Sequence, residues 1–104
     1  MLTKRQAIRE CKRLWRTVLE GEAKEKYEAL CFHPKFFEYE NMCPLCEYTQ
    51  QLINHPVGVY QKCRAENICP LVQQTGAACF GEDCVADYLD NPQLFAAVIM
   101  ALKE

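Results

Sequence analysis

The chain has 104 residues, of which half are hydrophobic, and its net charge is -2. These values exclude an intrinsically disordered chain, and they exclude a polycation that binds nucleic acid through its overall charge. They predict one small domain over residues 1–104 with a limited hydrophobic core. Eight residues are cysteine, and domains of this size often use a metal ion or disulfides to supplement the core.

The N-terminal segment shows no apolar core of the kind that a signal peptide has. Met1 leads directly into a basic, amphipathic pattern, and the longest apolar stretch, from Leu94 to Leu102, is too short to span a bilayer. We therefore expect a cytoplasmic protein with no membrane partner. Because cysteines in a reducing compartment bind metal more often than they form disulfides, metal binding is the first interpretation. An exported domain with its cysteines paired in disulfides is the alternative.

Residues 1–31 predict two amphipathic helices. Thr3 followed by Gln6 completes a capping box at the start of the first helix, and Gly21 is a natural stop after its end. The apolar side chains of this helix recur at helical spacing; they are Ile8, Cys11, Trp15, Val18 and Leu19. We expect Trp15 in the core.

The second helix is expected over residues 22–30, and it ends before His33-Pro34 because a residue before proline disfavours helical backbone. Its inward side would carry Ala23, Tyr27 and Leu30. An aromatic connector follows, with Phe36, Phe37 and Tyr39, which we expect to pack over the helices.

Two Cys-Pro steps predict the start of two further helices. Proline favours the first helical position because its missing N–H would be unpaired there. Cys43-Pro44 opens a helix that ends near residues 54–56, and Cys69-Pro70 opens a short helix that Gly76 ends. Asn91-Pro92 caps and begins a C-terminal helix within residues 91–103. The predicted fold is therefore all-α, mainly helical and irregular, stapled by a cysteine-rich metal site in residues 43–84.

Six cysteines in residues 43–84 are candidate metal ligands. Cys43 and Cys46 have the two-residue spacing of a metal-binding knuckle, and each Cys-Pro step places a cysteine at a helix N-terminus, where free backbone N–H groups favour a thiolate. We predict four ligands, namely Cys43, Cys46, Cys69 and Cys79, with Cys63 and then Cys84 as substitutes. Cys11 and Cys31 are expected to be buried hydrophobic residues.

Zinc is the metal that this pattern favours, and an iron–sulfur cluster is the alternative because both accept four cysteines. A dithiol redox motif at Cys43 and Cys46 is less well supported, since no strand precedes it. His33 and His55 are expected at the surface or capping carbonyls. No nucleophile–base pair, carboxylate dyad or phosphate-binding glycine loop can be read from the spacing, so we do not expect an enzyme.

Basic residues form a stripe along the first helix at three- and four-residue steps; they are Arg5, Arg9, Lys12, Arg13 and Arg16. The stripe is suited to contact with phosphates or with an acidic protein surface. A solvated face is the favoured interpretation, because charged runs beside an apolar face usually face water.

Residues 43–79 resemble a loose set of small cysteine-rich proteins encoded by bacteriophages. The motifs that carry this resemblance are Cys43-Pro-Leu-Cys46, Cys69-Pro70, and Thr75-Gly76 with Cys79 close behind, and Trp15 matches the tryptophan helix upstream in those proteins. Cys63 departs from the pattern, because five residues separate it from Cys69 and the phage proteins have a closer spacing there. The resemblance implies a metal-binding, phage-encoded accessory protein in the host cytoplasm, without known chemistry and not an enzyme.

These observations favour a zinc-stabilised interaction protein that binds and modulates a host protein, with a closed, structural metal site. The second interpretation is a nucleic-acid-binding zinc module that uses the basic helix. The third is an iron–sulfur or thiol redox protein.

Overall fold

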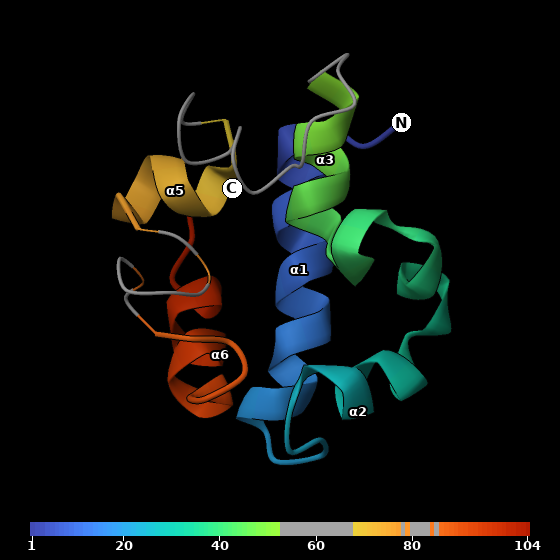
Figure 1. Cartoon of the computed structure of the whole chain (residues 1–104), viewed down its shortest axis with the longest axis vertical. Coiled ribbons are helices and arrows are strands. Elements are labelled where there is room, and N and C mark those ends of the chain that lie inside the picture. Colours follow the sequence, from blue (N-terminus) through green and yellow to red (C-terminus); the bar gives the residue numbers. More distant parts are fainter. Residues whose placement is uncertain (53–67, 78, 80–83, 85) are drawn as a thin grey trace.

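The computed structural model describes residues 1–52, 68–77, 79, 84 and 86–104. Within these ranges the regular elements are helices, and Figure 1 shows their arrangement. The α-helices are α1 (Lys4–Leu19), α2 (Lys26–Phe32), α3 (Pro44–Leu52), α5 (Pro70–Thr75) and α6 (Pro92–Met100), and the 3-10 helices are η1 (Pro34–Glu38) and η2 (Glu40–Met42). The prediction of a mainly helical fold is confirmed for this part of the chain.

Helix α1 is the central element, with α6 packed on one side and α2 and α3 on the other (Figure 1). Its inward face is almost wholly removed from water, which is the main source of stability for an amphipathic helix. The buried side chains on this face are Ala7, Ile8, Cys11, Leu14, Trp15 and Val18. The Trp15 ring meets the Phe95 ring of α6 edge to face, with 4.6 Å between the ring centroids, so Trp15 lies in the core as predicted.

The predicted ends of α1 are confirmed. The backbone N–H of Gln6 donates to the Thr3 hydroxyl at 3.1 Å, and the backbone N–H of Thr3 donates to the Gln6 side chain at 2.9 Å, which completes the capping box. Gly21 follows the last turn with φ of +82°, a left-handed conformation that glycine adopts without strain. Leu19 was expected to face the core, but its side chain is 41% exposed, because it lies at the edge of the buried face.

Helix α2 begins at Lys26, later than predicted. The Glu25 carboxylate accepts hydrogen bonds from the backbone N–H groups of Tyr27 and Glu28 at 2.9 and 2.8 Å, and this cap fixes the start. The buried side of α2 is formed by Lys26, Ala29 and Leu30. Tyr27 lies outside it and is 46% exposed, so its predicted inward position was wrong. The helix ends before His33-Pro34 as expected.

The connector from α2 to α3 packs only partly over the helices. Phe36 is fully buried, whereas Phe37 is 50% exposed. Before Cys43 the backbone turns through two left-handed residues, Asn41 with φ of 54° and Met42 with φ of 50°. This conformation is common for asparagine but costs free energy for methionine, so other contacts must hold the turn.

Both Cys-Pro steps begin helices as predicted. The first helical hydrogen bonds run from Glu47 N–H to the Cys43 carbonyl and from Gln73 N–H to the Cys69 carbonyl, each at 2.9 Å. Gly76, with φ of 73°, ends α5. The predicted extension of α3 beyond Leu52 lies outside the described residues.

Helix α6 begins at Pro92 as predicted, but the Asn91 side chain forms no capping hydrogen bond, so that detail of the prediction was wrong. Instead, the Gln93 side chain donates to the carbonyl oxygen of Val18 at 2.6 Å and ties the start of α6 to the end of α1. Among the described residues, no helix has the length and apolar character needed to cross a membrane.

Candidate metal centre

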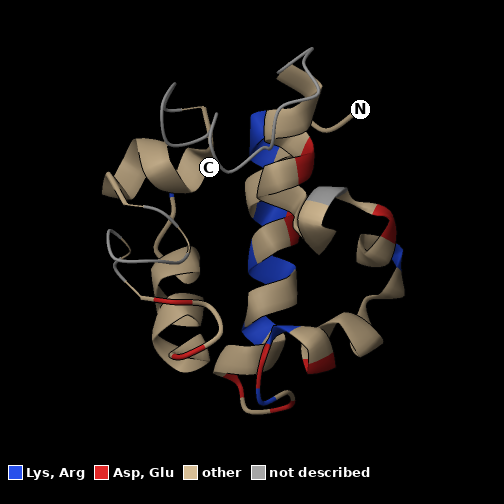
Figure 2. Cartoon of the chain, in the orientation of Figure 1, with Lys and Arg blue, Asp and Glu red and all other residues tan. Residues whose placement is uncertain are grey.

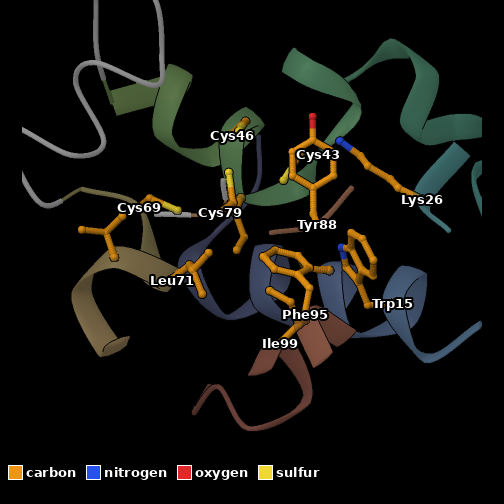
Figure 3. A pocket seen from close by; sticks show the side chains of 13 residues that line it. Trp15, Lys26, Cys43, Cys46, Cys69, Leu71, Cys79, Tyr88, Phe95 and Ile99 are labelled. Carbon is orange, nitrogen blue, oxygen red and sulfur yellow. The ribbon is translucent and has the colours of Figure 1, made fainter. Parts of the chain in front are cut away.

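Five cysteines from four parts of the chain line one small cavity, shown from close by in Figure 3. They are Cys11, Cys43, Cys46, Cys69 and Cys79. The cavity has a volume of about 30 Å³, which is room for an ion or one or two water molecules. Pockets for organic ligands usually measure hundreds of cubic ångströms, so this cavity does not suit an organic substrate.

The helices explain why these cysteines meet. Cys43 and Cys46 stand at the start of α3, Cys69 stands at the start of α5, and Cys79 follows α5. Helix starts expose backbone N–H groups and carry partial positive charge, which favours an anionic sulfur. In Figure 3, Cys43, Cys46 and Cys79 lie near the Tyr88 ring, and Cys69 approaches them from the side of Leu71. Helix α1 supplies the fifth cysteine, Cys11, which is 1% exposed.

The hydrogen bonds within the cluster favour a thiolate on Cys43. The thiols of Cys11 and then Cys46 donate to its sulfur, and these bonds, with the charge of Lys26 and a backbone N–H of Cys46, hold the pKa of Cys43 well below its usual value despite burial. The same hydrogen bonds to Cys43, with burial, raise the pKa values of Cys11 and Cys46. Of these three cysteines, Cys43 therefore loses its proton most readily.

Lys26 supplies positive charge beside the cluster. It lines the same cavity and is only 6% exposed, and neither of the ion pairs found among the described residues involves it. Its Nζ donates to the carbonyl oxygen of Asn41 at 2.9 Å and lies 4.9 Å from the centroid of the Tyr88 ring. A buried ammonium group is stabilised by a nearby anion, and the charge of Lys26 contributes to the lowered pKa of Cys43, after the hydrogen bonds from Cys11 and Cys46.

The four predicted ligands all line the cavity, although their role as ligands stays a prediction. As placed, no three His, Cys, Asp or Glu side chains in the described ranges lie where they could hold a metal ion. Of the two predicted substitutes, Cys63 lies outside the described residues. Cys84 is half-buried and is not among the residues that line the cavity.

Two members of the cluster were missed by the sequence reasoning. Cys11 is buried, as expected, but its thiol faces the other cysteines as well as the core. Its spacing gave no sign of this, because it follows the apolar pattern of α1. Lys26 was missed because a lysine in a short helix usually faces water.

Cys31 was expected to be buried, and this was wrong. It is exposed, and its thiol donates to the Tyr27 carbonyl at 3.5 Å within α2. The seven cysteines in the described part of the chain form no disulfides with one another.

The predicted histidine positions are partly tested. His33 is half-buried away from the cavity, and its Nε2 lies 3.0 Å from the Thr17 hydroxyl oxygen instead of at a carbonyl. Burial, followed by the charges of Arg13 and Lys35, lowers the pKa of His33. His55 lies outside the described residues.

The basic stripe runs along α1, and Figure 2 marks the Lys and Arg positions on this helix. Arg5, Arg9, Arg13 and Arg16 are exposed, and Lys12 is partly exposed. Arg9 forms an ion pair with Glu104, with 3.3 Å between Nε and Oε1.

Thiolates are soft donors that suit zinc, copper(I) and iron–sulfur clusters. The cavity combines cysteine sulfurs, apolar side chains and the side chain of Lys26. Comparison with known proteins adds no assignment: no family model, no curated protein and no solved structure matches this chain.

Proposed function

We propose that the protein is a small interaction module stabilised by a structural zinc ion, and that Cys43, Cys46, Cys69 and Cys79 hold the ion. The observation that carries the proposal is that cysteines from separate parts of the chain line one small cavity. They come from the two Cys-Pro helix starts, from the segment after α5 and from α1. When bound, zinc would join α3 to the segment around α5 and so contribute to folding.

The surroundings of the cavity support an anionic sulfur site. Zinc with four thiolates carries a net charge of about -2, and the buried ammonium of Lys26 offsets part of that charge. The Cys11 thiol, which donates to the Cys43 sulfur, supplies the kind of outer hydrogen bond that tunes metal–thiolate sites. On this proposal, Cys11 donates a hydrogen bond to the ligand Cys43 without binding the ion itself, and Cys79 is the fourth ligand.

The proposal requires the cysteine side chains to rearrange. The sulfurs line the same cavity but do not yet lie where three of them could hold an ion. Cysteine has one rotatable side-chain bond, and Cys79 is only half-buried in the segment after α5. On this proposal, zinc binding turns the four thiols towards a common point in the cavity that they line.

Replacing single cysteines by serine tests the assignment. Cys43→Ser, Cys46→Ser, Cys69→Ser and Cys79→Ser should each reduce bound zinc strongly, whereas Cys11→Ser should keep it with weaker affinity. Cys31→Ser is the matched control, because Cys31 is exposed and lies outside the cavity. Cobalt(II) substitution provides a second measurement, since thiolate-to-cobalt absorption reports the number of sulfur ligands. Full cobalt and zinc binding by Cys69→Ser or Cys79→Ser would refute the assignment.

A thiol redox function is the second candidate, and the lowered pKa of Cys43 beside Cys46 favours it. In that case Cys43 and Cys46 would form a reversible disulfide with a small-molecule disulfide as the oxidant. Titration of the protein with glutathione buffers, followed by mass spectrometry, separates the two candidates. A Cys43–Cys46 disulfide that forms readily in zinc-loaded protein would favour the redox function.

A further inference from the structure

The outward face of α1 carries a concentrated positive charge on an acidic protein. Residues 4–16 contain six basic residues and one acidic residue, so they carry +5, and the other residues together carry -7 because the whole chain carries -2. The stripe of Arg5, Arg9, Lys12, Arg13 and Arg16 occupies an arc of about 100° and a length of about 16 Å on an ideal helix. Glu10, the acidic residue within α1, lies outside this arc and pairs with Lys35 at 2.9 Å.

The composition of this face resembles a protein interface. Four of its five cations are arginine, which is enriched in protein interfaces and binds carboxylates in a bidentate manner, whereas lysine is depleted there. Two exposed leucines lie near the end of α1: Leu19, 41% exposed, follows the stripe on α1, and Leu94, 46% exposed, follows Gln93 in α6. They flank the hydrogen bond from Gln93 to Val18 that joins α6 to α1.

The chain itself shows that the stripe accepts a carboxylate. Glu104 lies on the stripe through its ion pair with Arg9, at 3.3 Å, while the Arg9 side chain is still 64% exposed. Arg5, Arg13 and Arg16 are exposed as well. A partner carboxylate can therefore approach the stripe along its length.

A long nucleic acid fits this face less well. Helices α2, α3 and α6 pack around the other sides of α1, so α1 cannot enter a major groove to contact bases. The acidic remainder of the molecule would lie beside a duplex that extends past the stripe. No aromatic side chain belongs to the stripe, so it lacks the stacking surface of single-strand binders.

We infer that this face docks an acidic, amphipathic helical segment of a partner protein, with Arg5, Arg9, Arg13 and Arg16 pairing with its carboxylates and Leu19 and Leu94 contacting its apolar side. The inference rests on the proposed interaction function and names the class of partner. Charge complementarity and the Arg9–Glu104 pair carry it.

The test uses the full, zinc-loaded chain and three fluorescent probes. The first probe is a synthetic amphipathic helix with glutamates on one face and leucines on the other. The second is a scrambled peptide of the same composition, and the third is a short DNA duplex. We expect the amphipathic peptide to bind more tightly than the scrambled peptide and the duplex.

Two charge reversals that change the net charge equally give the matched comparison. Arg13→Glu should weaken peptide binding by about tenfold or more, and Lys24→Glu, at an exposed position outside the stripe, should change it by less than about twofold. Leu19→Ala should weaken peptide binding and leave any duplex binding unchanged.

Three results would overturn the inference: no binding of the amphipathic peptide, equal binding of the scrambled peptide, or tighter and steeply salt-dependent binding of the duplex. The last result would assign the stripe to nucleic acid instead. Zinc content is measured on every sample, so failure of peptide binding by zinc-loaded protein refutes the docking surface and not the metal site.

Discussion

The Nζ of Lys26 donates a hydrogen bond to the carbonyl oxygen of Asn41 at 2.9 Å. This contact joins the first turn of α2 to the left-handed turn that leads into Cys43. Lys26 also lines the cysteine cavity and lowers the pKa of Cys43. One buried side chain thus supports both the position and the charge of the cysteine at the start of α3.

Lys26→Met should weaken zinc binding while keeping the apolar length of the side chain. Loss of the cation removes an attraction to the thiolates, and loss of the bond to Asn41 frees the turn before Cys43. We expect affinity for zinc to fall by about 10- to 100-fold, as for other residues that support metal ligands. Competition with a chromophoric chelator measures this change. Lys24→Met is the control, and an equal loss of affinity in both variants would contradict the role given to Lys26.

Trp15→Ala should destabilise the fold strongly. The Trp15 side chain is 2% exposed and packs on Phe95 across the α1–α6 contact. Its truncation should lower the free energy of unfolding by about 3–5 kcal/mol, measured by urea denaturation. Leu19→Ala, at a partly exposed position of the same helix, should cost less than about 1 kcal/mol. Similar losses in the two variants would show that α6 does not pack on Trp15 as described.

Thr3→Ala should remove the cap of α1. The Thr3 hydroxyl accepts from the backbone N–H of Gln6, and loss of such a cap costs about 1 kcal/mol. Thr3→Ser keeps the hydroxyl and should retain most of the stability. Thermal unfolding followed by circular dichroism distinguishes the two, and equal midpoints for Ala and Ser would refute the capping role.

His33 should make stability depend on pH in mildly acidic solution. Its pKa in the folded protein is lowered from the ordinary value of 6.5, so the unfolded chain binds the proton more readily than the folded one. Its contribution to stability is therefore complete above pH 6.5 and is lost as the pH falls below that value. His33→Gln should unfold with a weaker dependence on pH between neutral and mildly acidic solution. An unchanged pH profile in the variant would mean that His33 does not titrate with folding.

Much of the helical architecture could be predicted from local chemistry. The capping box at Thr3, the stop at Gly21 and the two Cys-Pro helix starts depend on residues within a few positions of each other, and all were confirmed. The predicted start of α2 was wrong because the Glu25 side chain caps the helix through hydrogen bonds to the backbone. The spacing of hydrophobic residues in the sequence does not reveal such a cap.

The cavity was only partly predictable for a different reason. Cys43, Cys46 and Cys69 could be singled out because they lie at predicted helix starts, where backbone N–H groups favour a thiolate. These three residues line one cavity with Cys79, the residue that was predicted to group with them. Cys11 and Lys26 reach the cavity through the packing of α1 and α2, which brings together residues distant in sequence. Such long-range contacts leave no local signal in one sequence.

Metal content measured together with the visible spectrum tests the central claim most directly. Full-length protein is purified from a bacterial cytosol without oxygen and without an affinity tag that binds metal, and elemental analysis is compared with protein concentration. We predict about one zinc ion per chain and no visible absorbance. Iron with a broad visible band would place the protein among iron–sulfur proteins. Folded protein without zinc or iron, with all of its thiols reacting freely, would contradict the account.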